Sequence, residues 1–151
     1  MLQLTEGITG WHLSQVYSDP YIVGAIQQDG RPAKPVSHPC AVYLSAFLDD
    51  RFLGAFLAIR FSKHEMELHS LLHRDALKHS RELGRQVIEW SFDHDIQRIT
   101  AYVIDGLHKA ANYCRRLGFV DEGRRRHACM KNGHPTDVLI LGLTRQDWRK
   151  S

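Results

Sequence analysis

Residues 97 to 121, QRITAYVIDGLHKAANYCRRLGFVD, contain a strand, a helix and the start of a second strand in one short unit. In its first part, apolar residues alternate with other residues at the two-residue period of a strand: Ile99, Ala101 and Val103. Farther on, apolar residues recur at three- and four-residue steps, on one face of a helix: Leu107, Ala110, Ala111, Cys114 and Leu117. Gly118 is the residue type best able to close a helix in the left-handed conformation, so residues 116–119 predict a corner between a helix and a strand.

Strand and helix patterns also lie upstream of this unit. Apolar runs at residues 41–47 and 52–61 flank Asp49-Asp50-Arg51 and predict an antiparallel pair joined by a tight turn, and residues 65–72 predict a third strand. From Ala76 onward, helical spacing predicts a long amphipathic helix. The third strand, this helix and the strand after Gln97 then form a βαβ unit, whose two strands run parallel. We expect these strands to splay apart and to leave a cleft beneath the helix.

The two ends of the chain give shorter signals. Apolar residues between 11 and 23 predict one or two short helices, interrupted near Asp19-Pro20 because proline cannot continue a helix interior. Residues 30–39 hold three prolines and a glycine and predict a loop, and Asn132-Gly133 marks a C-terminal hairpin. The expected order is helix, strand, strand, strand, helix, strand, helix, strand, strand, which is a mixed α/β (α+β) fold.

Composition agrees with a single domain over residues 1–151. The chain is 43% hydrophobic and 25% charged, and it has no apolar stretch near the ~20 residues that span a bilayer, so we expect no membrane segment and no signal peptide. Its three cysteines are odd in number and widely spaced, which favours a reducing, cytoplasmic compartment. The net charge of +3 is too small an excess to predict a nucleic-acid partner.

Two segments resemble a known family. HKAANYCRRLGF, residues 108–119, is similar to the segment before the last strands of the GNAT superfamily of acyl-CoA-dependent N-acetyltransferases. Residues 121–148, DEGRRRHACMKNGHPTDVLILGLTRQDW, resemble the C-terminal hairpin and tail of the branch that acts on ribosomal-protein N-termini and on phosphinothricin. The resemblance covers about residues 50–148 and implies the GNAT fold, with N-terminal helices, a mixed central sheet and a C-terminal β-hairpin. It implies transfer of an acetyl group from acetyl-CoA to a primary amine of a small molecule or peptide, by direct attack in a ternary complex.

In this family the coenzyme A diphosphate lies at the first turn of the long helix, where unpaired N–H groups and the helix dipole attract an anion. The family pattern is Arg or Gln, two residues, Gly, one residue, and then Gly or Ala. This chain reads HSRELG over residues 79–84, so only Gly84 matches and Glu82 replaces the first glycine. The cofactor contacts that the resemblance implies are Arg81, Glu82, Leu83, Gly84 and Arg85. Alternatively, Gly84 is a close-packing glycine in a structural helix, and Asp75 as N-cap would start that helix upstream.

The strand at residues 65–72 carries the candidates for acid–base chemistry. Glu67 and His69 share one face by the two-residue period, and a carboxylate or imidazole tuned toward neutral pH can take a proton from a substrate ammonium. Glu67 is the first candidate for the base and His69 the second, and the alternative is that both are partly exposed strand residues. The resemblance also implies that strand backbone binds the pantetheine arm at Leu71, Leu72 and His73.

The chain departs from the family at two positions. The asparagine that starts the family's helix falls on Leu107, and the tyrosine that protonates the departing thiolate falls on Cys114, with Tyr113 one position earlier. Tyr113 and Cys114 are therefore both candidates for the acid, and Cys114 is also interpreted as a small core residue. These departures leave a second interpretation open, a non-catalytic GNAT-like binding or assembly module, and divergent GNAT-like proteins encoded by tailed phages are similar in this respect.

The chain has ten histidines, which could bind a metal ion, but their spacing does not fit a metal-binding pattern. His64-Glu65 followed by His69 misses the zinc-protease pattern by one residue, and no cysteine pair supplies a structural site. We therefore expect no metal. Exposed strand edges at the C-terminal hairpin are compatible with a homodimer.

Overall fold

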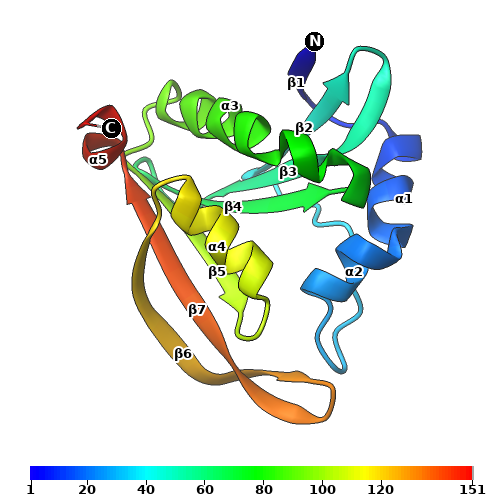
Figure 1. Ribbon diagram of the computed structural model, residues 1–151, viewed down its shortest axis with the longest axis vertical. Coiled ribbons are helices and arrows are strands. Elements are labelled where there is room, and N and C mark those ends of the chain that lie inside the picture. Colours follow the sequence, from blue (N-terminus) through cyan, green and yellow to red (C-terminus); the bar gives the residue numbers. More distant parts are fainter. Residues whose placement is uncertain (151) are drawn as a thin grey trace.

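The structure, a computed structural model, describes residues 1–150 and contains one mixed sheet with helices on both faces (Figure 1). The strands are β1 (Leu2–Glu6), β2 (Ala41–Leu48), β3 (Arg51–Arg60), β4 (Glu65–Leu72), β5 (Arg98–Ile104), β6 (Val120–Lys131) and β7 (His134–Thr144). The helices are α1 (Gly10–Ser18), α2 (Pro20–Ile26), the 3-10 helix η1 (Arg74–His79), α3 (Ser80–Phe92), α4 (His108–Arg116) and α5 (Arg145–Lys150). No helix within residues 1–150 is long and apolar enough to cross a membrane.

The sheet has the order β1-β2-β3-β4-β5-β7-β6. Every neighbouring pair is antiparallel except β4 and β5, which run parallel and are connected through α3. The predicted βαβ unit, the β2–β3 pair and the C-terminal hairpin are therefore confirmed. The mixed α/β architecture expected from the sequence is also confirmed.

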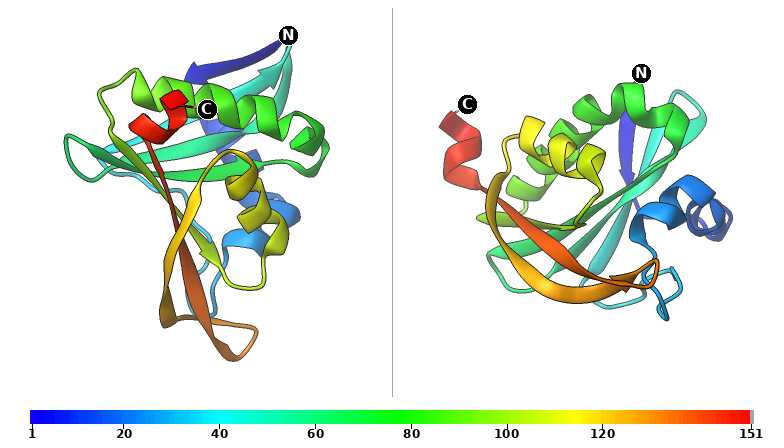
Figure 2. Two further views of the ribbon diagram at one scale, coloured as in Figure 1. Left: turned by 60° about the vertical axis from the view of Figure 1, so that its left-hand side comes forward. Right: turned by 60° about the horizontal axis from the view of Figure 1, so that its bottom comes forward.

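Side-chain alternation along the strands separates two cores, one on each face of the sheet. On the first face, α3 and α4 cover a cluster that includes Met66, Leu72 and Ile99. On the second face, α1 and α2 cover a smaller cluster that includes Leu57 and Leu71. The turned views show these helix pairs on different sides of the sheet (Figure 2). Residues of β4 with even numbers thus face α3 and α4, and those with odd numbers face the side of α1 and α2.

The turns form where the sequence predicts them, for local reasons. Asp19 ends α1 and caps α2, because its carboxylate accepts hydrogen bonds from the N–H groups of Tyr21 and Ile22. Gly118 closes α4 with φ +105°, and the β6–β7 turn has Asn132 at φ +53° and Gly133 at φ +80°. Positive φ at both central residues is the mark of a type I′ hairpin turn.

Three sequence-based expectations about the helices and strands were wrong. The expected order omitted β1 and α5, which are five and six residues long. The helix predicted from Ala76 is instead η1 followed by α3, which starts only at Ser80. Asp75 is not an N-cap, since His73 occupies that position and the Asp75 carboxylate pairs with Arg51.

Candidate functional site

The candidate site lies where β4 and β5 separate. The two strands pair at three positions, from Glu65 opposite Arg98 to Glu67 opposite Thr100. Beyond these pairs β4 continues to Leu72 and β5 to Ile104 without further pairing between them. The predicted splaying of the parallel pair is confirmed, and it leaves the edges of two central strands without their usual partner.

The paired part is held by charged and polar side chains on the second face. Arg98 forms a bidentate ion pair with Glu122, with Nη1 2.9 Å from Oε2, and its Nε donates to Thr100 Oγ1 at 3.1 Å. Thr100 Oγ1 donates in turn to Glu65 Oε2 at 2.8 Å. The hydrogen bonds from Arg98 lower the pKa of Glu122, because they stabilise its charged form. This network fixes the strands together immediately before they part.

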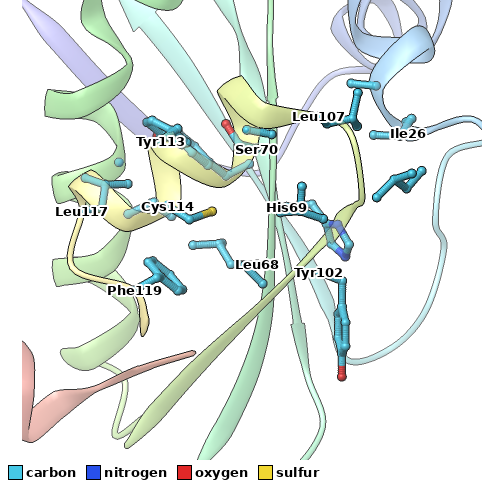
Figure 3. Close-up of a pocket in the computed structure, with 18 of the residues that line it drawn as sticks. Ile26, Leu68, His69, Ser70, Tyr102, Leu107, Tyr113, Cys114, Leu117 and Phe119 are labelled. Carbon is cyan, nitrogen blue, oxygen red and sulfur yellow. The ribbon is translucent and has the colours of Figure 1, made fainter. Parts of the chain in front are cut away.

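A cavity of about 240 Å³ occupies the gap between the separated strand ends (Figure 3). Its wall includes Ile26, Leu68, His69, Ser70, Tyr102 and Leu107. Leu68 and Ser70 face the side of α3 and α4, whereas His69 faces the side of α1 and α2. The cavity therefore reaches both faces of the sheet and can bring together two molecules that approach from opposite sides.

Glu67 and His69 form a close pair, with Glu67 Oε2 against His69 Nε2. The Glu67 side chain is 15% exposed and that of His69 30%, so both are largely shielded from water. His69 lines the cavity, and Glu67 lies behind it. This arrangement resembles a base held in orientation by a carboxylate. The base role that the sequence suggests for either residue stays a prediction.

Tyr113 of α4 is partly buried and reaches the start of α3. Its hydroxyl donates to the Ser80 carbonyl at 2.8 Å, and burial raises the pKa of Tyr113, so it stays protonated at physiological pH. Burial also raises the pKa of the neighbouring Cys114 thiol, to about 11. Both side chains line the cavity (Figure 3). The acid roles of Tyr113 and Cys114 stay predictions, and both residues keep a proton that they could donate.

Gly84 marks the closest approach of α3 and α4. A Cβ built on it would lie 2.5 Å from Tyr113 Oη and 2.7 Å from Leu117 Cδ1, so a larger residue would require these side chains of α4 and its C-cap to move. This contact agrees with the interpretation of Gly84 as a close-packing glycine in a structural helix, the alternative to a cofactor contact. Gly84 also lines the cavity, so a contact with a cofactor stays a prediction.

The other residues of the predicted diphosphate loop point in several directions. Leu83 is buried in the core, and the exposed Glu82 carboxylate accepts from Gln86 on the outer side of α3. Arg85 lies over the Trp148 ring at 5.9 Å, while Arg81 is exposed. The Ser80 N–H, which would be a free donor at the start of an isolated helix, already donates to Leu77 of η1. Fewer unpaired N–H groups are available here than the sequence suggests.

The end of β4, where the resemblance places the pantetheine arm, is fixed against β3. Leu71 and Leu72 are buried on opposite faces of the sheet, and the His73 N–H donates to the Leu53 carbonyl at 3.0 Å. Gly54 lies opposite Leu72 with φ +120°, and a Cβ there would overlap the Leu71 carbonyl oxygen. The β5-facing edge of this segment is the part that could bind a ligand, which stays a prediction.

The sequence analysis did not predict which residues form the cavity wall on the second face, the side of α1 and α2. The turn of the β6–β7 hairpin lies against the end of α2, because Lys131 Nζ donates to the Gly24 carbonyl at 2.9 Å. The Asp29 carboxylate accepts from the Asn132 and Gly133 N–H groups at 3.1 and 2.7 Å. The same hairpin contributes Val138 to the cavity wall, which also contains Ala25 and Ile26 of α2. No local pattern signals the contact between the hairpin turn and α2, because the partners are more than a hundred residues apart.

Solved structures show the same architecture across the whole chain. Spermidine N-acetyltransferase from Vibrio cholerae, crystallised with CoA and spermine, superposes with a TM-score of 0.80 at 15% identity, over 97% of this chain and 98% of that one. An N152L mutant of the same enzyme gives 0.82 at 14% identity, over 99% and 98%. A protein from Acinetobacter baylyi, provisionally assigned as an acetyltransferase, gives 0.79 at 16% identity, over 97% and 94%. No known protein-family profile matches the chain. The chain therefore has the fold of the GNAT acetyltransferases.

Proposed function

We propose that this protein is an acetyl-CoA-dependent N-acetyltransferase that acts on a primary amine. The observation that carries the proposal is the cavity between β4 and β5, which reaches both faces of the sheet and has His69 in its wall. A thioester can approach it from the side of α3 and α4, and an amine from the side of α1 and α2. Fold neighbours that bind CoA support the assignment.

His69 is the proposed base, and Glu67 positions it. Because Glu67 holds the Nε2 proton, Nδ1 is the nitrogen that can accept a proton from the substrate ammonium. The freed amine nitrogen then bonds to the thioester carbonyl carbon, the carbon–sulfur bond breaks, and coenzyme A leaves as a thiolate, which takes up the proton that the nitrogen loses on becoming an amide. From the sequence, Glu67 is the first candidate for the base and His69 the second. We reverse this ranking because, of the two, only His69 lies in the cavity wall.

The residues of the cavity fit the reactive end of acetyl-CoA better than its diphosphate. The β5-facing edge of β4 beyond Glu67 has backbone groups that can pair with the amides of a pantetheine arm. Ser70 and Tyr113 add hydroxyl groups on the side of α3 and α4. At the diphosphate position, the exposed Arg81 is the residue that would meet the phosphates, since the Ser80 N–H is already bonded.

Thermal unfolding with acetyl-CoA tests the proposal. A ligand that binds only the folded state adds about 2.7 kcal/mol at one hundred times Kd. For a domain of this size, that corresponds to a rise in Tm of roughly 5–11 °C. If millimolar acetyl-CoA leaves Tm unchanged, the protein is the non-catalytic module and the proposal is wrong.

Two variants then separate binding from chemistry. His69→Gln removes the base and should lower turnover at least about a hundredfold, while the acetyl-CoA shift in Tm persists. Glu67→Gln should lower turnover less, because it weakens the orientation of His69 but leaves the base in place. Equal turnover of His69→Gln and the unchanged protein would exclude His69 as the base.

A further inference from the structure

We propose that the acceptor is a small amine with one positive charge and an apolar substituent, and that polyamines are poor substrates. This inference rests on the proposed function and concerns the α2 side of the same cavity. The similar enzyme from Vibrio cholerae is a spermidine N-acetyltransferase, so the two proteins would differ in substrate within one fold.

The cavity wall on the α2 side is aliphatic. It is formed by Ala25, Ile26, Ile104, Leu107 and Val138, which come from four different parts of the chain. Ile26 and Leu107 lie near each other at one end of the cavity, beyond His69 (Figure 3). An alkyl or aryl group of the acceptor would lose contact with water against these side chains, which favours its binding.

The polar groups in this wall carry no negative charge that a second ammonium could use. Gln28, His69 and Tyr102 are its polar members, and no carboxylate lines the cavity within residues 1–150. A spermidine-like acceptor would thus bury a second ammonium without a counter-charge. An unpaired buried charge is strongly disfavoured.

Several carboxylates on or beside the strands that line the cavity already have partners in the protein. Each of the following accepts a hydrogen bond or forms an ion pair: Asp29 with the hairpin turn, Glu65 and Glu122 with Arg98, Glu67 with His69, and Asp105 and Asp137 with Arg124. A polyamine would have to break one of these pairs to reach a carboxylate. The net charge of +3 gives it no long-range attraction either.

A short acceptor suits the size of the cavity. The cavity has a volume of about 240 Å³. A four-carbon amine fits this space beside an acetyl group. A diamine of the same length has its second ammonium only four carbons from the first, so this charge would meet the aliphatic wall.

Butylamine and butane-1,4-diamine form the matched pair that tests the inference, because they differ by one ammonium at equal chain length. We expect kcat/KM with acetyl-CoA to be at least tenfold higher for butylamine. Direct binding of each amine to the protein without acetyl-CoA, measured by calorimetry, should show the same preference. Equal or higher values for the diamine, or for spermidine, would overturn the inference while leaving an active acetyltransferase.

A substitution in the aliphatic wall sharpens the test. Ile26→Glu places a carboxylate in the wall and should reduce or reverse the preference for butylamine by at least tenfold, whereas Ile26→Gln, of the same length but neutral, should not. If acetyl-CoA neither shifts Tm nor reacts with any amine, the proposed function fails, and calorimetry still decides the ligand class. Failure of both amines to bind, or an unchanged preference in Ile26→Glu, would contradict the inference.

Discussion

The two halves of the β4–β5 pair differ, although they belong to the same strands. In the first half, from Glu65 to Glu67, each residue is paired with β5, and Glu65 of β4 also contacts Arg98 and Thr100 of β5. In the second half, from Leu68 to Leu72, the pairing with β5 is absent and a cavity takes its place. The paired half secures the strands, so the parted half can leave backbone groups free for a ligand.

Side-chain hydrogen bonds and ion pairs stabilise the first half. The second half depends on glycines, which have no side chain to prevent close packing. Glu65 of β4 holds the paired strands from one face through its contacts with Arg98 and Thr100 of β5. At the parted end, Gly54 allows β3 to lie close to β4, and Gly84 allows α3 to lie close to α4. An added methyl group at either glycine would overlap neighbouring atoms. Substitutions of glycine should therefore damage the parted half more than loss of an ion pair damages the paired half.

Gly54→Ala should have the largest effect. It combines a strained φ of +120° with an overlap against the Leu71 carbonyl, and we expect a loss of about 3 kcal/mol or more in the free energy of unfolding, measured in urea. Gly106→Ala is the control, because its φ of +98° is also strained but nothing lies within 4 Å of its Cβ. A loss equal to that of Gly106→Ala would mean that the close approach of β3 and β4 is unimportant.

Gly84→Ala should cost about 1–3 kcal/mol of unfolding free energy, because its Cβ would press on Tyr113 and Leu117. Adding Tyr113→Phe removes the nearer contact, so the double variant should lose less than the sum of the two single variants. Gly24→Ala, in open space on α2, should instead stabilise by about 0.5–1 kcal/mol. Additive losses in the double variant would contradict the packing account of Gly84.

Arg98→Met should cost about 1 kcal/mol or less at pH 7, since both side chains of the ion pair are about one-third exposed: 31% for Arg98 and 33% for Glu122. The pKa of Glu122 is lowered from 4.5 by Arg98, so the pair stabilises the fold above about pH 4.5 and this stabilisation is lost as the pH falls through the folded-state value. The deficit of Arg98→Met in urea unfolding should thus be full at pH 7 and should shrink as the pH falls below about 4.5. A deficit that grows toward low pH would contradict the ion-pair account.

The smallest expected effect is a difference in the rates at which two cysteines are alkylated. Burial raises the pKa of Cys114 to about 11, so roughly one thiol in a thousand is ionised at pH 8. The exposed Cys40 should react with iodoacetamide at least tenfold faster than Cys114, as followed by mass spectrometry. Cys40→Ser should abolish the fast phase. Rapid labelling of Cys114 would instead indicate that the parted half opens to solvent.

Much of this fold could be predicted because its elements are long and periodic. The bounds predicted for β4 and the turn residues Asn132 and Gly133 match the structure, since strand alternation and turn chemistry are local properties. β1 was missed because it is a short edge strand with mostly exposed side chains. The 3-10 start before α3 was missed because its residues have the same spacing of apolar side chains as an α-helix.

The candidate site could be predicted only in part. Glu67 and His69 were found because one strand places them on one face, and Gly84 because a family pattern marks it. The aliphatic wall was not found, since Ile26 and Leu107 meet only through the tertiary structure. Which of the two base candidates faces the cavity also depends on where β5 leaves β4, and no sequence pattern reveals that point.

Hydrogen–deuterium exchange with and without acetyl-CoA tests most directly whether the parted half of β4 is the ligand site. Peptides that cover residues 68–72 should exchange more slowly when acetyl-CoA is bound, because a ligand would pair with the backbone edge that β5 leaves free. Peptides that cover residues 65–67 should be unchanged, since their amides already lie in the paired half. Unchanged exchange at residues 68–72 in a protein saturated with acetyl-CoA would contradict the account.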